Sequence, residues 1–176
     1  LNWPLLHYHE CIPYLNQKKS NYKYSLGLIS SGTNFRNMNN HLENIENQNS
    51  EQKLIASLNN YMKKYKDVNL IIFLHPFEKT NNNVYNESLN YYKKQFDNHN
   101  ITFGEINKNS MEYFSQTKLC ISSHSQLSTI RLFCGYKTIV APLYQDNIFF
   151  QEKNIESITC YTTNNLEKMI TNSLKM

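Results

Sequence analysis

The sequence predicts an α/β protein with a Rossmann-like, doubly wound parallel sheet of about six strands. Two observations support this fold class. Short apolar segments alternate with amphipathic helical segments, the order that parallel strands and their crossover helices require. The apolar segment Leu70–Leu74 also lacks polar alternation, which is typical of a strand covered on both faces of its sheet.

The chain of 176 residues is long enough for one domain, or for one lobe of a larger protein. Residues 1–22 contain Pro4 and Pro13, which would interrupt a long helix. We therefore expect residues 1–22 to form a linker or inter-domain segment and residues 23–176 to form the domain.

Regular elements begin with a strand over Tyr24–Ile29, followed by a polar, Asn-rich loop over residues 37–50. Apolar side chains at helical spacing then predict a helix that starts at Ser50 and Glu51 and ends near Tyr65. Next we expect, in order, the buried strand Leu70–Leu74, a helix over residues 85–98 and a strand over Ile101–Ile106.

The second half of the domain continues the same alternation. Ser110 with Glu112 in the first turn predicts a short helix to Ser115. The remaining elements are, in order, the strand Leu119–Ile121, the helix Gln126–Cys134, the strand Lys137–Ala141, a last strand near Ser157–Tyr161 and a helix from Asn164 to about Leu174.

A hydroxyl-rich turn joins the strand Leu119–Ile121 to its helix and predicts an anion site. The amides at a helix start carry partial positive charge, and small hydroxyl side chains let an anion come close. Some of these hydroxyls could only cap the helix, but five in eight residues exceed what capping requires. The residues concerned are Ser122, Ser123, Ser125, Ser128 and Thr129. His124, in the same turn, reads as an exposed loop residue.

A second candidate segment closes the strand Leu70–Leu74, where His75-Pro76 follows directly. Proline holds the preceding residue in an extended conformation, so this pair can simply mark a strand end. Carboxyl ends of parallel strands share one edge of a sheet, however, and His75 there could contact a phosphate oxygen of a departing nucleotide. Glu78 lies just beyond and is a candidate for a ribose or sugar hydroxyl.

The first strand ends in Ser30, Ser31 and Gly32, which we expect to form a close-approach turn at the same edge. The segment lacks both the dinucleotide-binding G-x-G-x-x-G pattern and the G-K-[ST] of P-loops. It could touch a donor sugar or phosphate, with Arg36 assisting.

Composition limits the other functions. The net charge of +4 comes from scattered lysines without a basic stripe, which argues against a nucleic-acid binder. It fits an anionic substrate or membrane surface, and it fits a plain soluble protein about as well. The four cysteines form no C-x-x-C pair, which favours a reducing compartment without disulfides or zinc. His7, His9 and Glu10 have no further ligand at a defined spacing, so we expect no metal site.

Leu-His-Pro at 74–76, followed by the run Leu119–Thr138 with its serine-rich turn, resembles the C-terminal half of bacterial GT-B glycosyltransferases. The resemblance is to the group of sialyltransferases and of capsule or lipopolysaccharide transferases, over residues 24–176. It implies one lobe of a GT-B architecture that holds the nucleotide sugar of a metal-independent transferase.

Carried over from that family, His75 is the histidine that contacts the nucleotide phosphate, and Ser122, Ser123, Ser128 and Thr129 match the phosphate-binding serine motif. The resemblance implies a cell-surface glycan or lipid-linked acceptor, a cytoplasmic location with possible peripheral membrane contact, and no cofactor. In the family the catalytic base lies in an N-terminal domain, so we expect this chain to lack it.

Three alternatives fit the same fold. A sugar-nucleotide epimerase and a polyol-phosphate transferase both place nucleotide diphosphates at equivalent strand ends. A non-catalytic nucleotide-binding module would share the pocket without the chemistry.

Overall fold

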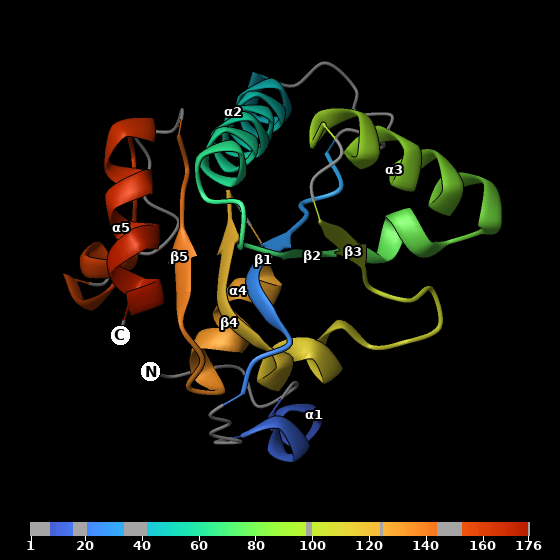
Figure 1. Ribbon diagram of the computed structural model, residues 1–176. Coiled ribbons are helices and arrows are strands. Elements are labelled where there is room, and N and C mark those ends of the chain that lie inside the picture. Colours follow the sequence, from blue (N-terminus) through green and yellow to red (C-terminus); the bar gives the residue numbers. More distant parts are fainter. Residues whose placement is uncertain are drawn as a thin grey trace.

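A computed structural model describes residues 8–15, 21–33, 42–97, 100–123, 125–143 and 153–175 of the chain. Its centre is a five-stranded sheet in the order β3-β2-β1-β4-β5 (Figure 1). Every neighbouring pair is parallel. The strands are β1 (Tyr24–Ile29), β2 (Leu70–Phe73), β3 (Ile101–Phe103), β4 (Thr117–Ser122) and β5 (Thr138–Val140). This is the doubly wound arrangement expected from the alternation of elements.

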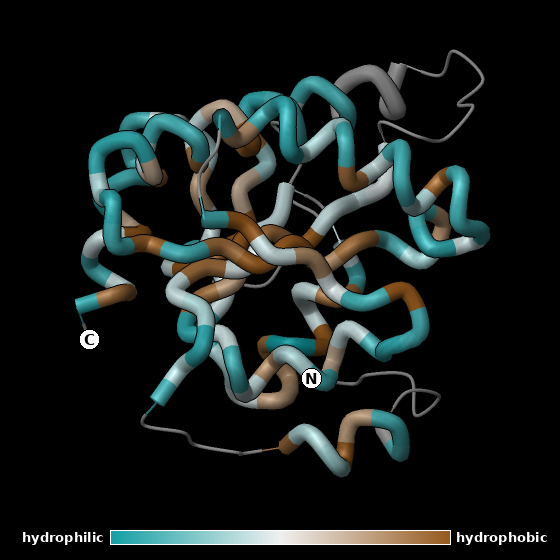
Figure 2. The backbone as a smooth tube through the Cα atoms, turned by 45° about the vertical axis from the view of Figure 1, so that its right-hand side comes forward, coloured by the Kyte–Doolittle hydropathy of each residue, from teal (hydrophilic) through white to brown (hydrophobic). Residues whose placement is uncertain are grey.

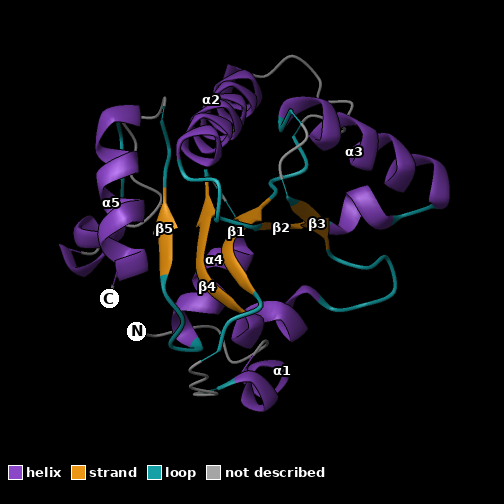
Figure 3. Ribbon diagram, viewed as in Figure 1, coloured by secondary structure: helices purple, strands orange, loops and turns teal. Residues whose placement is uncertain are grey.

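Helices cover both faces of this sheet (Figures 1 and 3). The larger face packs against α2 (Leu42–Lys64), α3 (Asn82–Gln95) and α5 (Thr163–Lys175). The opposite face packs against α4 (Gln126–Phe133) and η4 (Ser110–Gln116), and the N-terminal pair α1 (Tyr8–Cys11) and η2 (Ile12–Tyr14) packs on these two helices. Two further 3-10 helices are η3 (Pro76–Lys79) and η5 (Lys153–Ile158).

The sheet is apolar on both faces, and Figure 2 shows its strands as a hydrophobic centre inside a hydrophilic shell of helices. In β2, Leu70 and Ile72 face the larger core, whereas Ile71 and Phe73 face the other one. Continuous burial of this strand, which has no polar alternation, confirms that both of its faces are covered.

Cys11 places the N-terminal segment on the domain. It is buried beside Met111, Phe114 and Cys134, in a small cluster beneath η4 and α4. The four cysteines are free and buried.

One expected helix start and one expected capping residue are wrong, because in each case a polar side chain earlier in the sequence caps the helix. α3 begins at Asn82 rather than at residue 85, since the Asn81 side chain accepts the amide of Val84. η4 is capped by Asn109 rather than Ser110, and Glu112 completes that capping box. α2 begins at Leu42, so most of the loop expected over residues 37–50 is helical. Asparagine costs a helix only tenths of a kcal/mol, about 0.7 at most, and this composition did not prevent one.

The sixth strand expected near Ser157–Tyr161 is reduced to a single parallel bridge between Val140 and Thr159. Hydrogen bonds within η5 compete here with strand pairing to β5. The Thr159 amide donates to Glu156 O and its hydroxyl donates to Ile155 O, so η5 continues to the point where the bridge forms.

Arg131 fixes α4 against the sheet. Its guanidinium is fully buried between the rings of Phe114 and Tyr136, at 5.2 and 4.9 Å from their centroids. It donates from Nη1 to Phe114 O at 2.8 Å and from Nη2 to Thr117 O at 2.6 Å. A longer bond runs from Nε to Lys137 O. One side chain thus joins the end of η4 to the starts of β4 and β5.

Arg131→Lys should lower the free energy of unfolding by about 2–4 kcal/mol, because an ammonium keeps the buried charge but cannot reach all these carbonyls. Denaturant unfolding measures this. The control, Lys94→Arg, exchanges the same two residue types on the exposed end of α3 and should change stability by less than about 0.5 kcal/mol. Equal stability of the two variants would contradict the role given to Arg131.

Candidate functional site

A pocket of about 680 Å³ opens at the carboxyl ends of the strands, near the junction of β1 and β4 where the strand order reverses. Ligands of doubly wound sheets bind at such a junction. Its walls come from the ends of β1 and β2, the loop after β3 and the start of α4. The lining residues are Ser30, Ser31, Phe73, Leu74, His75, Pro76, Lys79, Ile106, Asn107, Lys108, Asn109, Ser110, Ser125, Gln126, Leu127 and Ile130.

His75 is held by its own turn. It is the N-cap of η3, with Pro76 in the first turn, and its Nδ1 accepts the amide of Phe77 at 3.1 Å. Because Nδ1 accepts, the proton of the neutral ring is on Nε2. The backbone amide of His75 donates to the Glu78 carboxylate at 2.6 Å, which completes a capping box.

Gly32 brings the β1 loop against that histidine. A Cβ at position 32 would lie 2.9 Å from Cβ and Cγ of His75, so only glycine fits without movement. The residue also has φ +68°, a conformation that favours glycine. The two loops predicted from sequence therefore meet, and they do so in direct van der Waals contact.

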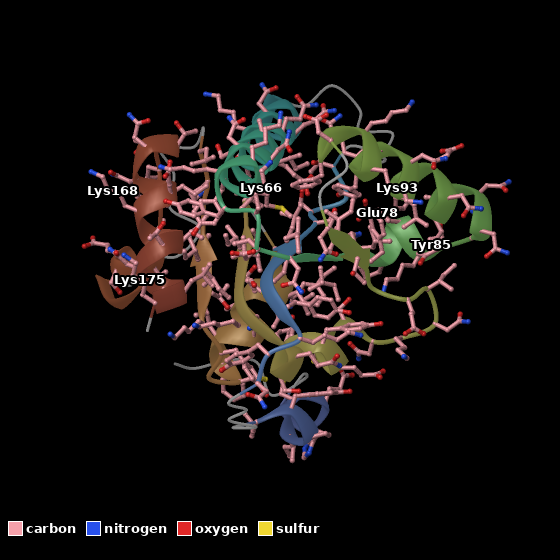
Figure 4. All side chains as sticks on the ribbon, in the orientation of Figure 1. Lys66, Glu78, Tyr85, Lys93, Lys168 and Lys175 are labelled. Atoms are coloured by element: carbon pink, nitrogen blue, oxygen red, sulfur yellow. The ribbon has the colours of Figure 1, made fainter. Side chains whose placement is uncertain are left out.

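Glu78 is fully buried behind the pocket wall, beside α3 (Figure 4). Its second carboxylate oxygen accepts the hydroxyl of Tyr92 at 3.1 Å, and that hydroxyl lies 2.7 Å from Ser30 Oγ. The pKa of Glu78 is raised to about 7, chiefly by burial. Hydrogen bonds from Ser30, His75 and Tyr92 oppose the rise, and the charge of Glu51 adds to it.

A second buried carboxylate organises the β1 loop from α2. Glu51 accepts the Ser31 amide at 2.8 Å and the hydroxyls of Ser31 and Thr33, both at 2.6 Å. These donors compensate a carboxylate that is 0% exposed. Glu51 therefore fixes the position of Ser31 at the pocket edge.

The serine-rich turn divides into a buried part and a part at the pocket. Ser122 and Ser128 are buried and hydrogen-bond each other at 2.5 Å. Ser125 caps α4 by accepting the amide of Leu127 and lines the pocket. Ser123 is 2% exposed, and within the described part of the chain its hydroxyl has no hydrogen-bond partner. Thr129 is half-buried on α4, outside the lining residues.

Lys79 is a cation in the pocket wall that the sequence reasoning missed. Its ammonium donates to the carbonyls of Glu105 and Lys108, both at 3.1 Å, and burial lowers its pKa. The charges of Glu78 and Glu112 also act on this ammonium and oppose the fall in its pKa. The missed signal was its position, three residues beyond Pro76 in the same turn.

Of the residues expected from sequence, Ser30, Ser31, His75, Pro76 and Ser125 line the pocket. Gly32 and Glu78 lie behind them in the contacts described above. Sequence reasoning missed the loop over residues 106–110 and the buried partners Glu51 and Tyr92. Arg36, His124 and His7 lie outside the described residues.

Among the residues that the structure describes, no three His, Cys, Asp or Glu side chains gather as a metal site would require. Within those same residues, no helix is long and apolar enough to cross a membrane.

No protein-family model matches the chain, and no curated protein matches it. Solved structures do. One is the UDP-GlcNAc 2-epimerase of Neisseria meningitidis bound to UDP-GlcNAc, at 15% identity and a TM-score of 0.54 over 95% of this chain and 39% of that one. Another is the UDP-GlcNAc 2-epimerase of Methanocaldococcus jannaschii in complex with UDP-GlcNAc and UDP, at 16% identity and a TM-score of 0.55 over 89% and 40%.

This chain therefore spans about two-fifths of the length of these solved chains. At such low identity the likeness shows the fold, which the epimerases share with glycosyltransferases of GT-B architecture. The expected GT-B-like lobe is confirmed as a fold.

Gly32→Ala should destabilise the protein by more than its backbone strain alone, because the new methyl group meets the ring of His75. Gly135→Ala is the matched control, since Gly135 also has positive φ, at +84°, but is exposed. We expect a loss of about 1 kcal/mol for the control and at least about 1 kcal/mol more for Gly32→Ala in denaturant unfolding. Equal losses would mean that the loops do not touch.

Glu78→Gln should flatten the dependence of stability on pH. A raised pKa in the folded state means that the folded protein binds this proton more tightly than the unfolded chain. The stabilising contribution is then complete below about pH 4.5, the ordinary value for the group, and is lost as the pH rises through about 7.

The loss of unfolding free energy is at most about 3 kcal/mol, because folding raises the pKa of Glu78 from 4.5 to about 7. Unfolding free energies at pH 5 and pH 8 measure it. Glu87→Gln, at an exposed site on the same helix α3, should keep the wild-type slope. A wild-type slope in Glu78→Gln would show that Glu78 is ionised in the folded state at both pH values.

Proposed function

We propose that this chain is the nucleotide-sugar-binding lobe of a GT-B enzyme. The observation that carries the proposal is the convergence of three strand-end segments on one pocket: the β1 loop, the His75–Pro76 turn and the start of α4. The ligand class follows from the chemistry of the walls. They combine a helix N-terminus, hydroxyl side chains and the ammonium of Lys79, which together suit a phosphate-bearing ligand.

In this proposal the phosphates of the donor lie at the start of α4. Ser125, which lines the pocket, donates to a phosphate oxygen, and the amides of the first helical turn face the same charge. Ser123 is buried outside the lining residues, so it belongs to the support of the turn. Ser122, Ser128 and Thr129 support the turn from within α4 and β4. The hydrogen-bonded pair of Ser122 and Ser128 fixes the turn's curvature.

His75 is the proposed catalytic residue. With Nδ1 engaged by its own turn, Nε2–H is the donor that can reach a phosphate oxygen. Charge builds on that oxygen as the bond between the sugar and the phosphate breaks, and a hydrogen bond there stabilises the transition state more than the ground state. Protein donors supply this stabilisation, so the proposal requires no metal or other cofactor.

The reaction that we place first is transfer of the sugar to a cell-surface glycan or a lipid-linked acceptor. An acceptor site and a base belong to the second lobe of such an enzyme. Lipid-linked acceptors would be met at the cytoplasmic face of the membrane, where exposed lysines such as Lys168 and Lys175 on α5 would favour an anionic surface (Figure 4).

Epimerisation of a nucleotide sugar is the second candidate, and the solved structures favour it, because those named above are UDP-GlcNAc 2-epimerases. The two reactions differ in their need for an acceptor. A transferase releases nucleotide only when an acceptor takes the sugar, whereas an epimerase changes the sugar of the donor with no acceptor present.

Binding of CMP, CDP, UDP, GDP and their sugar derivatives to this chain, measured by calorimetry in the presence of a chelator, tests the site. One base should be preferred, and His75→Ala should weaken that ligand by about 1–3 kcal/mol, or roughly tenfold to a hundredfold. His9→Ala, which removes an exposed histidine outside the pocket, should bind normally. If no nucleotide binds, or if His75→Ala binds as well as wild type, the proposed site is wrong.

Turnover decides between the reactions and is measured on the whole protein, because this chain spans only about two-fifths of the solved chains. Nucleotide release that depends on an added acceptor identifies a transferase. Conversion of the donor sugar without acceptor identifies an epimerase, and binding with neither reaction identifies a non-catalytic module.

A further inference from the structure

Two loops of the pocket meet on one buried carboxyl group. Glu78 accepts the His75 amide at 2.6 Å with one oxygen and contacts the Tyr92 hydroxyl at 3.1 Å with the other. Tyr92 Oη lies 2.7 Å from Ser30 Oγ, which also accepts the amide of Gly32 at 3.0 Å. The chain of contacts therefore runs from the His75 turn, through the interior, to the β1 loop, and Ser30 also hydrogen-bonds Glu78 directly.

Ser30 is the end of this network that reaches the pocket, since it is one of the lining residues. Its hydroxyl carries a single proton, and so does that of Tyr92. The direction in which these protons point depends on whether Glu78 can itself donate.

An ionised Glu78 can only accept, so it draws the hydroxyl protons of Tyr92 and Ser30 toward the interior. A protonated Glu78 can donate to Tyr92 Oη, which then donates to Ser30 Oγ. In that arrangement the proton of Ser30 is released from the network and can turn toward the pocket.

We propose that Glu78 is a positioning residue: it holds the amide of His75, and its protonation decides, directly and through Tyr92, whether the Ser30 hydroxyl donates inward or to an anionic ligand. The identity of that ligand rests on the proposed function. Ionisation also places a negative charge behind the pocket wall, so both effects make an anion bind more tightly when Glu78 is protonated.

The groups around Glu78 bring its ionisation near neutral pH. The charged and titratable groups that face it are Glu51 from α2, Tyr91 and Tyr92 from α3, and His75 and Lys79 from its own turn. Burial and the charge of Glu51 raise its pKa to about 7 against the opposing hydrogen bonds. The tyrosine pKa values are themselves raised, to about 12 for Tyr91 and well above the ordinary value for Tyr92, so neither phenol titrates near pH 7.

The first test needs no ligand. The nuclear magnetic resonance shift of the backbone amide at position 75 should titrate with a midpoint near 7 in wild type and should not do so in Glu78→Gln. His75→Gln removes the imidazole ring but keeps the backbone amide, so the amide at position 75 should still titrate. Titration that persists in Glu78→Gln, or that vanishes in His75→Gln, overturns the inference.

The second test measures affinity for the preferred nucleotide sugar between pH 5.5 and 9, a range in which the diphosphate diester does not titrate. Wild-type affinity should fall by about tenfold as the pH rises across this range. A fall of this size is expected if nucleotide binding raises the pKa of Glu78 by about one unit. The part due to Glu78 is the difference between wild type and Glu78→Gln, because every other titratable group is the same in both proteins.

Glu78→Gln should therefore bind the ligand as wild type does at low pH, and its affinity should not show the decrease with rising pH that is due to Glu78. Tyr92→Phe separates the relay from simple charge: it should shrink the fall in affinity while the amide at position 75 still titrates. A Glu78→Gln profile identical to wild type refutes the inference and leaves the proposed function intact. Absence of nucleotide binding with a Glu78-dependent amide titration refutes the proposed function and leaves the positioning role of Glu78 intact.

Discussion

The hydrogen bond from the His75 amide to the buried carboxyl group of Glu78 is the interaction on which the pocket depends. It closes the capping box of η3, fixes the extended conformation before Pro76, and so aims the histidine ring across the sheet edge. The ring in turn packs on Gly32, which holds the loop after β1. A carboxyl group in the interior is costly, and here its cost is offset by donors from three separate segments.

The sequence predicted most of the architecture because burial on both faces of a parallel sheet leaves a strong pattern. The unbroken apolar run of β2 and the shorter apolar segments of β1 and β4 located these strands, and the strand ends then placed the His75 turn and the β1 loop on one edge. Side-chain caps such as Asn81 were missed, because a single polar residue decides where a helix begins and apolar periodicity does not register it.

The buried polar residues of the site were predicted only in part. Glu51, Tyr92 and Arg131 read as ordinary helix residues, and their partners are distant in sequence, so spacing along the chain gives no sign of their burial. Glu78 was expected to meet a sugar hydroxyl and instead lies behind the wall that such a sugar would touch. The local sequence pattern identified the segment that contains His75 and Glu78. Tertiary packing decided which of its side chains line the pocket.

The central strand pair has a consequence for how this pocket comes into being. β1 pairs with β4 through Tyr24 and Thr117, so their contact encloses β2, α3 and β3 within one long loop of chain. Closing such a loop costs entropy before any contact compensates it, which makes this pairing a slow event of folding. The pocket straddles that junction. Chains arrested in a partly folded state would therefore contain much of the secondary structure but no binding site, and ligand affinity would report completed folding more strictly than helix content does.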